Sequence, residues 1–193
     1  MKCLLCESFS LSHICSSCQK LYLTPKIYKR EIEGITVISF YRYDEIKELL
    51  HTKHTDLGYY IYSILAKNSF QMFAYNFKYI KNVSSIGIDE DIKSGYSHTA
   101  ILNKALQSHS IQPEFNRLKA ENKISYSGKN RAFRFENSRD FILKDIKNED
   151  IILVDDIITT GSTLQQAIQT ITKKKKNVLL CLTLADASLN TVK

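Results

Sequence analysis

The sequence is poor in glycine and proline, and this scarcity excludes several classes of protein. Six Gly and two Pro among 193 residues leave no room for a flexible linker, a collagen-like tract or a Gly/Pro-rich low-complexity region. No stretch approaches the ~18 uncharged apolar residues of a membrane span, and residues 1–7 lack the apolar run of a secretion signal. Since 44% of the residues are hydrophobic and 24% are charged, the chain can bury a core. We therefore expect a soluble, cytoplasmic α/β protein.

Positive charge is in excess and is concentrated in two places. The 27 Lys and Arg residues outnumber the 20 Asp and Glu residues, which gives a net charge of +7. One cluster extends from Arg117 to Arg134 and holds six basic residues against Glu121 alone. The other is the run Lys173–Lys176. Each cluster is either solvated surface, such as the basic end of a helix, or a patch for the phosphates of a small ligand or a nucleic acid.

Four of the five cysteines lie within the first eighteen residues, in two Cys-x-x-Cys pairs. Each pair, Cys3 with Cys6 and Cys15 with Cys18, brings two sulfurs to one metal from a tight turn, and two pairs complete a tetrahedral site. Disulfides would need an oxidising compartment, for which nothing else in the sequence argues. A redox pair needs one such motif that opens a helix after a strand. An iron–sulfur cluster also uses cysteine ligands, but two matched pairs in a short ribbon are more typical of zinc. We predict a structural zinc knuckle over residues 1–24.

The rest of the chain alternates between strand and helix patterns. Residues 34–43 alternate and are β-branched, which predicts a strand pair, and apolar residues recur at helical spacing over 44–67 with a break near 56–58. Further strands are predicted at 83–88, 115–118, 151–154 and 178–184, with helices over 99–109 and 162–173. Continuous apolar strands separated by helices predict a parallel sheet buried on both faces. Ligands of such sheets bind beyond the carboxyl ends of the strands.

The strongest motif follows the strand at 151–154. Two carboxylates, Asp155 and Asp156, come at the carboxyl end of this strand, and a hydroxyl-rich loop then opens directly into a helix. The backbone N–H groups of such a loop bind a phosphate monoester with the help of the helix dipole. The loop residues are Thr159, Thr160, Gly161, Ser162 and Thr163. The glycine permits close approach of backbone to ligand, and the hydroxyls are neutral donors. Because carboxylates repel a phosphate, the Asp pair suits sugar hydroxyls or a hydrated Mg²⁺.

Neither simple helix capping nor a P-loop accounts well for these features. Helix capping and a turn would require one or two polar residues but not the whole ordered set. The P-loop of nucleoside triphosphatases also binds phosphate, and the stretch around Gly128 and Lys129 is the place where one could lie. It fails because Gly128 has no glycine five residues before it and Lys129 has no Ser or Thr after it.

The segment Val154–Thr163 resembles the signature of type I phosphoribosyltransferases, which bind phosphoribosyl pyrophosphate. Together with the two N-terminal Cys-x-x-Cys pairs, it resembles more narrowly the ComF family of bacterial competence proteins (ComFC type). Residues 43–53 are also similar to the region between knuckle and core in that family. The resemblance implies an α/β, parallel-sheet, type I phosphoribosyltransferase fold over residues 25–193, behind the knuckle of residues 1–24. Within it, residues 25–80 would form a helical and hairpin hood and residues 81–193 the core.

The resemblance also implies roles for individual residues. Asp155 and Asp156 would be the catalytic pair that binds the ribose hydroxyls, directly or through Mg²⁺, and the loop 159–163 would hold the 5′-phosphate. Arg117 and Lys119 match basic positions that follow a strand in the family and would lie near the pyrophosphate. The ComF stretch Arg-x-Arg-Gly-Phe-Asn-Gln is replaced here by residues 92–98, which keep only the glycine and an aromatic residue.

Two functions from different classes follow. By resemblance, the protein acts in DNA uptake during natural transformation, binding phosphoribosyl pyrophosphate with Mg²⁺ and handling single-stranded DNA. The tyrosines of residues 59–79 and the basic surface offer stacking faces and charge for such a strand. The protein would act with other competence proteins, which would bring it to the inner membrane. Alternatively, it is an active phosphoribosyltransferase that transfers the phosphoribosyl group to an unidentified acceptor. The altered stretch 92–98 favours ligand binding over turnover.

Overall fold

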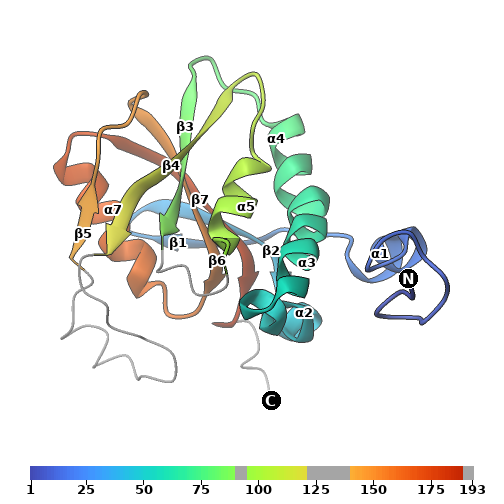
Figure 1. The fold of residues 1–193 in the computed structure, drawn as a ribbon. Helices are drawn as coiled ribbons and strands as arrows, with labels where there is room; N and C mark the ends of the chain where they lie inside the picture. The colour runs from blue at the N-terminus through green and yellow to red at the C-terminus, as the bar shows by residue number, and fades with distance from the viewer. Residues whose placement is uncertain (90–94, 121–139, 189–193) are drawn as a thin grey trace.

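The fold is organised around one seven-stranded sheet (Figure 1). The computed structural model describes residues 1–89, 95–120 and 140–188. In chain order, the elements are α1 (Ser16–Tyr22), β1 (Tyr28–Ile32), β2 (Ile35–Arg42), α2 (Tyr43–Leu50), the 3₁₀ helix η1 (His51–His54), α3 (Asp56–Ala66), the π-helix η2 (Lys67–Gln71), α4 (Met72–Asn76), β3 (Val83–Asp89), α5 (His98–Lys104), β4 (Ile111–Ala120), β5 (Phe141–Leu143), β6 (Asp150–Ile158), α7 (Ser162–Lys173) and β7 (Asn177–Asp186). Within the described part of the chain, no helix is long and apolar enough to cross a membrane.

The five central strands of the sheet are parallel. The strand order is β1-β2-β7-β6-β3-β4-β5, and β2, β7, β6, β3 and β4 run in the same direction. The edge strands β1 and β5 are antiparallel to their neighbours. Residues 151–154 of β6 are fully buried, as expected for a strand in the middle of a sheet that is covered on both faces. The predicted α/β parallel sheet is therefore confirmed, with an antiparallel strand at each edge.

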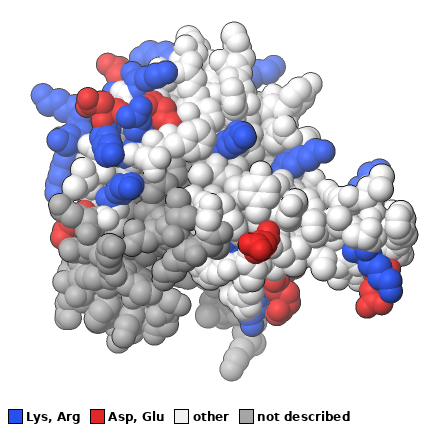
Figure 2. Space-filling model, in the orientation of Figure 1, with Lys and Arg blue, Asp and Glu red and all other residues white. Residues whose placement is uncertain are grey.

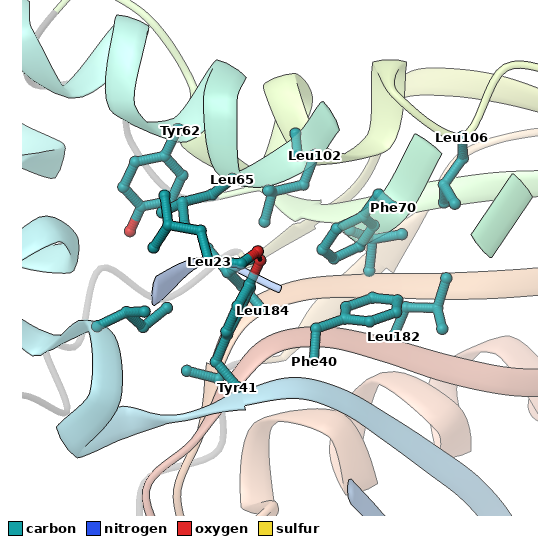
Figure 3. Packing of buried hydrophobic residues seen from close by; sticks show 14 of the residues in the cluster. Leu23, Phe40, Tyr41, Tyr62, Leu65, Phe70, Leu102, Leu106, Leu182 and Leu184 are labelled. Carbon is teal, nitrogen blue, oxygen red and sulfur yellow. Dashed lines mark hydrogen bonds between the residues drawn. The ribbon is translucent and has the colours of Figure 1, made fainter. Parts of the chain in front are cut away.

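Helices cover the two faces of the sheet separately. On the hood face, the face covered by α3 and α5, Phe40 and Leu182 of the sheet pack with Phe70 and Leu102 of the helical layer (Figure 3). On the opposite face, α7 packs Leu164, Ala167, Ile168 and Ile171 against Ile151, Leu153 and Cys181 of β6 and β7. The alternation of inward-facing residues along β6 divides the core into these two layers.

Several element boundaries agree with the sequence predictions. The helix predicted over 162–173 is α7, and the strand predicted at 83–88 is β3 with one additional residue. The helical region predicted over 44–67 consists of α2, η1 and α3, and its break lies at Thr55. The strand pair expected at 34–43 begins earlier, because β1 at Tyr28–Ile32 is the first arm of the hairpin.

Other boundaries differ from the predictions for identifiable reasons. The helix predicted over 99–109 ends at Lys104, because the N–H of Leu106 turns back to the carbonyl of Asn103. The strand predicted at 115–118 is longer, since β4 pairs with β3 and β5 on its two sides. The strand predicted at 151–154 continues to Ile158 because β7 pairs alongside it. The two aspartates after Val154 therefore lie inside β6 and not beyond it.

The N-terminal residues form a small lobe beside the helical layer (Figure 1). Cys15 is the N-cap of α1, and its sulfur accepts the N–H of Cys18. Ile14 is fully buried in the same core cluster as the hood-face residues. The ring of His13 stacks on Tyr60 of α3 with 4.4 Å between centroids. The lobe thus packs against the helices of the hood face and shares their apolar core.

The Lys173–Lys176 run ends helix α7. Lys173 is the last helical residue, Lys174 is the C-cap and Lys175 has a left-handed backbone (φ 59°). Lys176 Nζ donates to the carbonyls of Ile146 and Asn148 at 2.9 Å each. This geometry supports the interpretation of the run as the basic end of a helix.

Candidate functional site

The topology of the sheet marks one crevice at its carboxyl edge. β3 and β6 are neighbours, but β3 leads to α5 on the hood face and β6 leads to α7 on the opposite face. In open α/β sheets, such a reversal opens a crevice outside the carboxyl ends of the strands, and ligands bind there. The carboxyl end of β6 and the loop after it, residues 155–163, lie along one side of this crevice, and the carboxyl end of β3 lies along the other.

The loop after β6 has the local geometry of an anion-binding turn. Gly161 adopts a left-handed backbone (φ 84°) at the N-cap of α7, a helix of twelve residues. The first N–H groups of that helix have no partner within the helix, and helix starts of this kind bind anions; the N–H of Ser162 donates to Thr160 Oγ1 at 3.4 Å. Thr160 Oγ1 lies 3.2 Å from Ser162 Oγ. A cavity of about 20 Å³ is lined by Asp155, Thr159, Gly161, Ser162 and Thr163 together with neighbouring apolar residues. The structure thus brings these predicted residues together.

The two neighbouring aspartates have different surroundings. Successive side chains of a strand point to opposite faces of the sheet. Asp155 lines the loop cavity, and its Oδ1 accepts the N–H of Asp156 at 2.9 Å. Asp156 is only 7% exposed and meets Lys53 and His98 on the hood face. The pair that the sequence suggested would act together is therefore divided between the loop and the hood.

Three side chains converge on one oxygen of Asp156. Lys53 Nζ donates to Asp156 Oδ2 at 3.2 Å, His98 Nε2 lies 3.2 Å from the same oxygen, and the Tyr62 hydroxyl donates to it at 3.5 Å. The other oxygen, Oδ1, accepts the N–H of Ile157 at 2.8 Å. Together these contacts join η1, α3, α5 and β6 at one buried carboxylate.

The surroundings of Asp156 favour its ionised form. Burial alone would raise the pKa of Asp156, but the hydrogen bond from His98 and the positive charge of Lys53 outweigh it and hold this pKa below its ordinary value of 3.8. Burial raises the pKa of Tyr62, and the negative charge of Asp156 raises it further. Tyr62 therefore remains a neutral hydrogen-bond donor beside a charged carboxylate.

Sequence reasoning did not include Lys53, Tyr62 or His98 among the site residues. Lys53 lies 103 positions and Tyr62 94 positions before Asp156 in the chain. No local spacing links residues so far apart. The available signals were weak: His98 ends the altered stretch 92–98, and Lys53 ends the segment similar to the ComF region between knuckle and core.

Tyr96 fastens the turn that carries Lys53. Its hydroxyl donates to the carbonyl of Lys53 at 2.8 Å and to the carbonyl of Thr55 at 3.2 Å. The hydroxyl fits there because Gly58 has no side chain: a Cβ at that position would overlap both the Tyr96 hydroxyl and the carbonyl of Thr52. Tyr96, two residues before α5, therefore fixes the position of η1.

The β1–β2 hairpin lies against the loop after β6. Arg30 of β1 donates to the carbonyl of Thr159 at 2.9 Å and to Ser188 Oγ at 2.9 Å, and it pairs with Asp186 at 3.5 Å. A Cβ at Gly161 would overlap Ile32 of the same strand. Arg30 was not predicted as a site residue, because nothing in its local sequence links it to a loop 129 positions away.

The two predicted pyrophosphate residues lie on β4, one strand further from β6. Arg117 Nε is 3.1 Å from Oε2 of the buried Glu114, so its guanidinium is engaged within β4. Lys119 is exposed, and its backbone pairs with Asp89 at the carboxyl end of β3. Lys119 thus lies at the carboxyl edge of the sheet. Residues 121–134 of the basic stretch lie outside the described residues.

The four N-terminal cysteines form one cluster. The Sγ atoms of Cys3, Cys6, Cys15 and Cys18 all lie within 4.8 Å of one another, and Cys6 Sγ is 3.7 Å from Cys15 Sγ. A tetrahedral zinc site with Zn–S bonds of about 2.3 Å requires S···S distances of roughly 3.8 Å. The N–H of Cys15 donates to Cys3 Sγ at 3.3 Å and lowers the pKa of the Cys3 thiol to about 6. The donor set and its spacing therefore fit a closed metal site.

A broader hollow lies at the other edge of the sheet. It has a volume of about 550 Å³ and is lined by residues at the amino end of β4 and the end of α5, among them Lys104, Ile111, Pro113 and Lys147. None of the predicted site residues lines it. Because parallel sheets bind ligands at the carboxyl edge, we assign the candidate site to the smaller loop cavity and the crevice beside it.

Comparison with solved structures returns phosphoribosyltransferases. A hypoxanthine phosphoribosyltransferase from Staphylococcus aureus is 20% identical, with 65% of this chain and 62% of that chain covered and a TM-score of 0.40. This chain thus spans less than two thirds of that enzyme. An adenine phosphoribosyltransferase is 18% identical, with 89% of each chain covered and a TM-score of 0.45. The hypoxanthine enzyme from Trypanosoma cruzi is 18% identical, with 81% and 71% covered and a TM-score of 0.38.

No match was found among curated proteins. The family model PRTase-CE matches residues 25–192, which include every strand of the sheet and the whole loop after β6. The chain therefore carries a phosphoribosyltransferase-type domain and belongs to the PRTase-CE family.

Proposed function

We propose that the protein binds phosphoribosyl pyrophosphate in the crevice between β3 and β6. The observation that carries this proposal is the loop 159–163, which enters α7 through the left-handed Gly161 and shares a cavity with Asp155. The loop N–H groups would take the 5′-phosphate. Asp155 would face the ribose hydroxyls. Asp156 is bound to Lys53 and His98, so it would contact the ribose only together with these two side chains. Membership of the PRTase-CE family supports this ligand class.

The residues around the loop also suit Mg²⁺. The Asp155 carboxylate and the threonine hydroxyls are the hard oxygen donors that this ion prefers. Mg²⁺ bound together with the ligand would neutralise charge on its pyrophosphate. The chain's own part is to fix the phosphate through backbone N–H groups and to orient the ribose through a carboxylate, which are positioning effects.

A calorimetric titration with phosphoribosyl pyrophosphate in the presence of Mg²⁺ tests the proposal. Asp155→Asn removes the charge but keeps the shape, and we expect roughly a tenfold or greater loss of affinity, the usual size for a hydrogen bond to a charged group. Asp145→Asn is the control, because Asp145 is exposed and lies before β6. Equal affinity of wild type and Asp155→Asn would contradict the assignment, and failure of the wild type to bind would overturn the function.

Turnover defines the alternative function, an active phosphoribosyltransferase that moves phosphoribosyl to an acceptor. The same loop and Asp155 would hold the donor in both cases. Release of pyrophosphate from phosphoribosyl pyrophosphate, measured with and without nucleobases or single-stranded DNA, separates binding from transfer. Acceptor-dependent release that Asp155→Asn abolishes would establish transfer, and release no faster than without protein would leave ligand binding.

We also propose that the cysteine cluster holds one structural zinc ion. Four thiolates at tetrahedral spacing leave no open coordination position, so the ion would fold the lobe and not react. Metal analysis of the purified chain should give one zinc per protein. Cys6→Ser should lower that ratio well below one, and a ratio unchanged in this variant would exclude Cys6 as a ligand.

Single-stranded DNA binding, the finer expectation from the ComF resemblance, is supported by a row of aromatic rings. His13 stacks on Tyr60, Tyr60 contacts Tyr59 edge-on at 5.5 Å, and Tyr59 contacts Tyr96 at 5.9 Å. Tyr59 and Tyr60 are each 50% exposed, so bases could stack on them. The positive charge is arranged less favourably: on the face that Figure 2 shows, Lys and Arg gather chiefly at the upper left together with Asp and Glu, on the side where Figure 1 places β5 and α7.

A salt-dependent titration of labelled single-stranded DNA tests this second function. Tyr60→Ala should weaken binding by ~1–3 kcal/mol if a base stacks there. Tyr75→Ala is the matched control, because Tyr75 is 84% exposed and stands outside the row. Equal binding by both variants would remove the support for a stacking surface, and with it the proposed role in DNA uptake beside other competence proteins.

A further inference from the structure

Lys53 brings a positive charge from the hood into the crevice. It belongs to η1, yet its Nζ lies 3.2 Å from Oδ2 of Asp156 in β6. The pairing of β6 with β3 ends at Val154, two residues before Asp156, so the ammonium lies at the carboxyl edge of the sheet, beyond the point where the two strands stop pairing. About a quarter of the Lys53 side-chain surface is exposed, against 11% for Asp156. The lysine thus faces solvent at the crevice while the carboxylate lies behind it.

Several independent contacts hold Lys53 there. The Tyr96 hydroxyl bonds to the carbonyl of Lys53 itself, and Gly58 leaves the space for that hydroxyl. His98 and Tyr62 occupy the remaining approaches to Asp156 Oδ2, and their rings contact each other edge-on at 5.5 Å. A lysine on the open surface would not be held by so many contacts, because exposed ion pairs contribute little to stability and are easily broken.

The basic side chains near the loop differ in the groups that they contact. The loop itself offers neutral donors, and Arg30 lies against its outer side with its guanidinium donating to the Thr159 carbonyl. Arg117 is paired with the buried Glu114 on β4. Lys119 lies at the same edge but on β4, which β3 separates from β6. Lys53 is held directly on Asp156 of β6, where the second anionic group of a ligand bound by the loop would lie.

We propose that Lys53 is a ligand-binding residue that contacts the pyrophosphate of phosphoribosyl pyrophosphate, with Asp156 and His98 as its positioning residues. The inference rests on the proposed function and adds to it one binding residue and the assignment of each anionic group of the ligand to one side of the crevice. The loop binds the 5′-phosphate, and the hood binds the pyrophosphate.

Three probes separate the two halves of the site: phosphoribosyl pyrophosphate, ribose 5-phosphate and inorganic pyrophosphate, each titrated calorimetrically at one fixed Mg²⁺ concentration. Lys53→Gln removes the charge but can still donate a hydrogen bond to Asp156. We expect it to weaken binding of pyrophosphate and of the whole ligand about tenfold, and to leave ribose 5-phosphate within about twofold. Lys53→Arg should restore most of the affinity. Lys47→Gln, an exposed lysine of α2, is the matched control and should bind all three probes as the wild type does.

A measurement on the unmodified chain provides a second test. Lysine acetylation followed by mass spectrometry should show that pyrophosphate protects Lys53 about fivefold or more, and that it does not protect Lys47. This readout does not depend on whether Lys53→Gln folds.

The outcomes distinguish the inference from the proposed function. If Lys53→Gln binds pyrophosphate like the wild type, or Lys53 is not protected, Lys53 is only the structural partner of Asp156 and the inference is overturned. If the wild type binds ribose 5-phosphate but not pyrophosphate, the inference fails while the loop assignment stands. If the wild type binds none of the three probes, the proposed function fails and the inference with it.

Discussion

The two sides of the crevice are built in opposite ways. The loop side consists of Asp155 and the continuous segment Thr159–Thr163, which offers backbone N–H groups and neutral hydroxyls at a helix start. The hood side is assembled from four separate elements, from which Lys53, His98 and Tyr62 meet the buried carboxylate of Asp156. Backbone groups are fixed once the strand and helix form, whereas the charged cluster exists only after η1, α3, α5 and β6 have packed together.

This difference predicts different sensitivities for the two sides. A buried charge depends on its partners, since removing one leaves the others without compensation. A loop that binds through its backbone tolerates the loss of one side chain far better. We therefore expect substitutions on the hood side to affect stability and pyrophosphate binding together, and substitutions on the loop side to affect chiefly the binding of the sugar phosphate.

The largest effect is expected from Asp156→Ala. It leaves the buried His98 and the partly buried Lys53 without their carboxylate, which should cost ~3 kcal/mol or more of unfolding free energy. Asp155→Ala, on the loop side of the same strand, should cost about 1 kcal/mol. Urea unfolding of the two variants measures both values. Equal losses would contradict the division between the two sides.

The pH dependence of stability sharpens the same contrast. The pKa of Asp156 in the folded chain lies below 3.8, its ordinary value, so its contribution to stability is fully present above about pH 5 and is lost progressively as the pH falls from there towards the folded-state pKa. We expect a loss of about 1 kcal/mol between about pH 5 and pH 3, with more lost at lower pH. Asp156→Asn should flatten this part of the profile when unfolding is followed at several pH values. A profile that this variant leaves unchanged would show that other carboxylates carry the dependence.

Gly58→Ala tests how Tyr96 holds η1 in place. Alanine normally favours a helix over glycine by ~1 kcal/mol, but here its Cβ would overlap Tyr96 and the backbone of Thr52. We expect a net destabilisation of about 1–2 kcal/mol, with weaker pyrophosphate binding because η1 shifts. The control is Gly87→Ala in β3, where a Cβ would lie at an ordinary 3.4 Å from Thr99 Cβ. A stabilised Gly58→Ala chain would show that the turn can move without cost.

The smallest effect is expected from Arg30→Met beside the loop. Arg30 donates to the Thr159 carbonyl and would keep this carbonyl from facing a phosphate bound by the loop, so its loss should weaken ribose 5-phosphate binding about fivefold, or ~1 kcal/mol. Pyrophosphate binding should not change. Lys29→Met, an exposed neighbour on the same strand, is the control. A larger loss of affinity for pyrophosphate than for ribose 5-phosphate would contradict the assignment of Arg30 to the loop side of the crevice.

The predictability of each side from sequence follows from how it is built. The parallel sheet, α7 and the loop 159–163 could be predicted, because apolar runs and a contiguous motif express them within a few residues. Lys53, Tyr62 and His98 could not, since the contacts that bring them to Asp156 join residues as far as 103 positions apart. The prediction that Asp155 and Asp156 act as a pair overlooked the strand that continues to Ile158, whose pleat turns the two side chains apart.

The two edge strands of the sheet have a consequence for association between molecules. An edge strand exposes unpaired N–H and C=O groups, which invite pairing with another chain. Here β5 is only three residues long, and β1 has five residues, three of them the charged Lys29, Arg30 and Glu31. Short and charged edges disfavour the addition of a further strand. The two edge strands thus protect the sheet against pairing with a second chain, although the sheet is open and has two lateral edges.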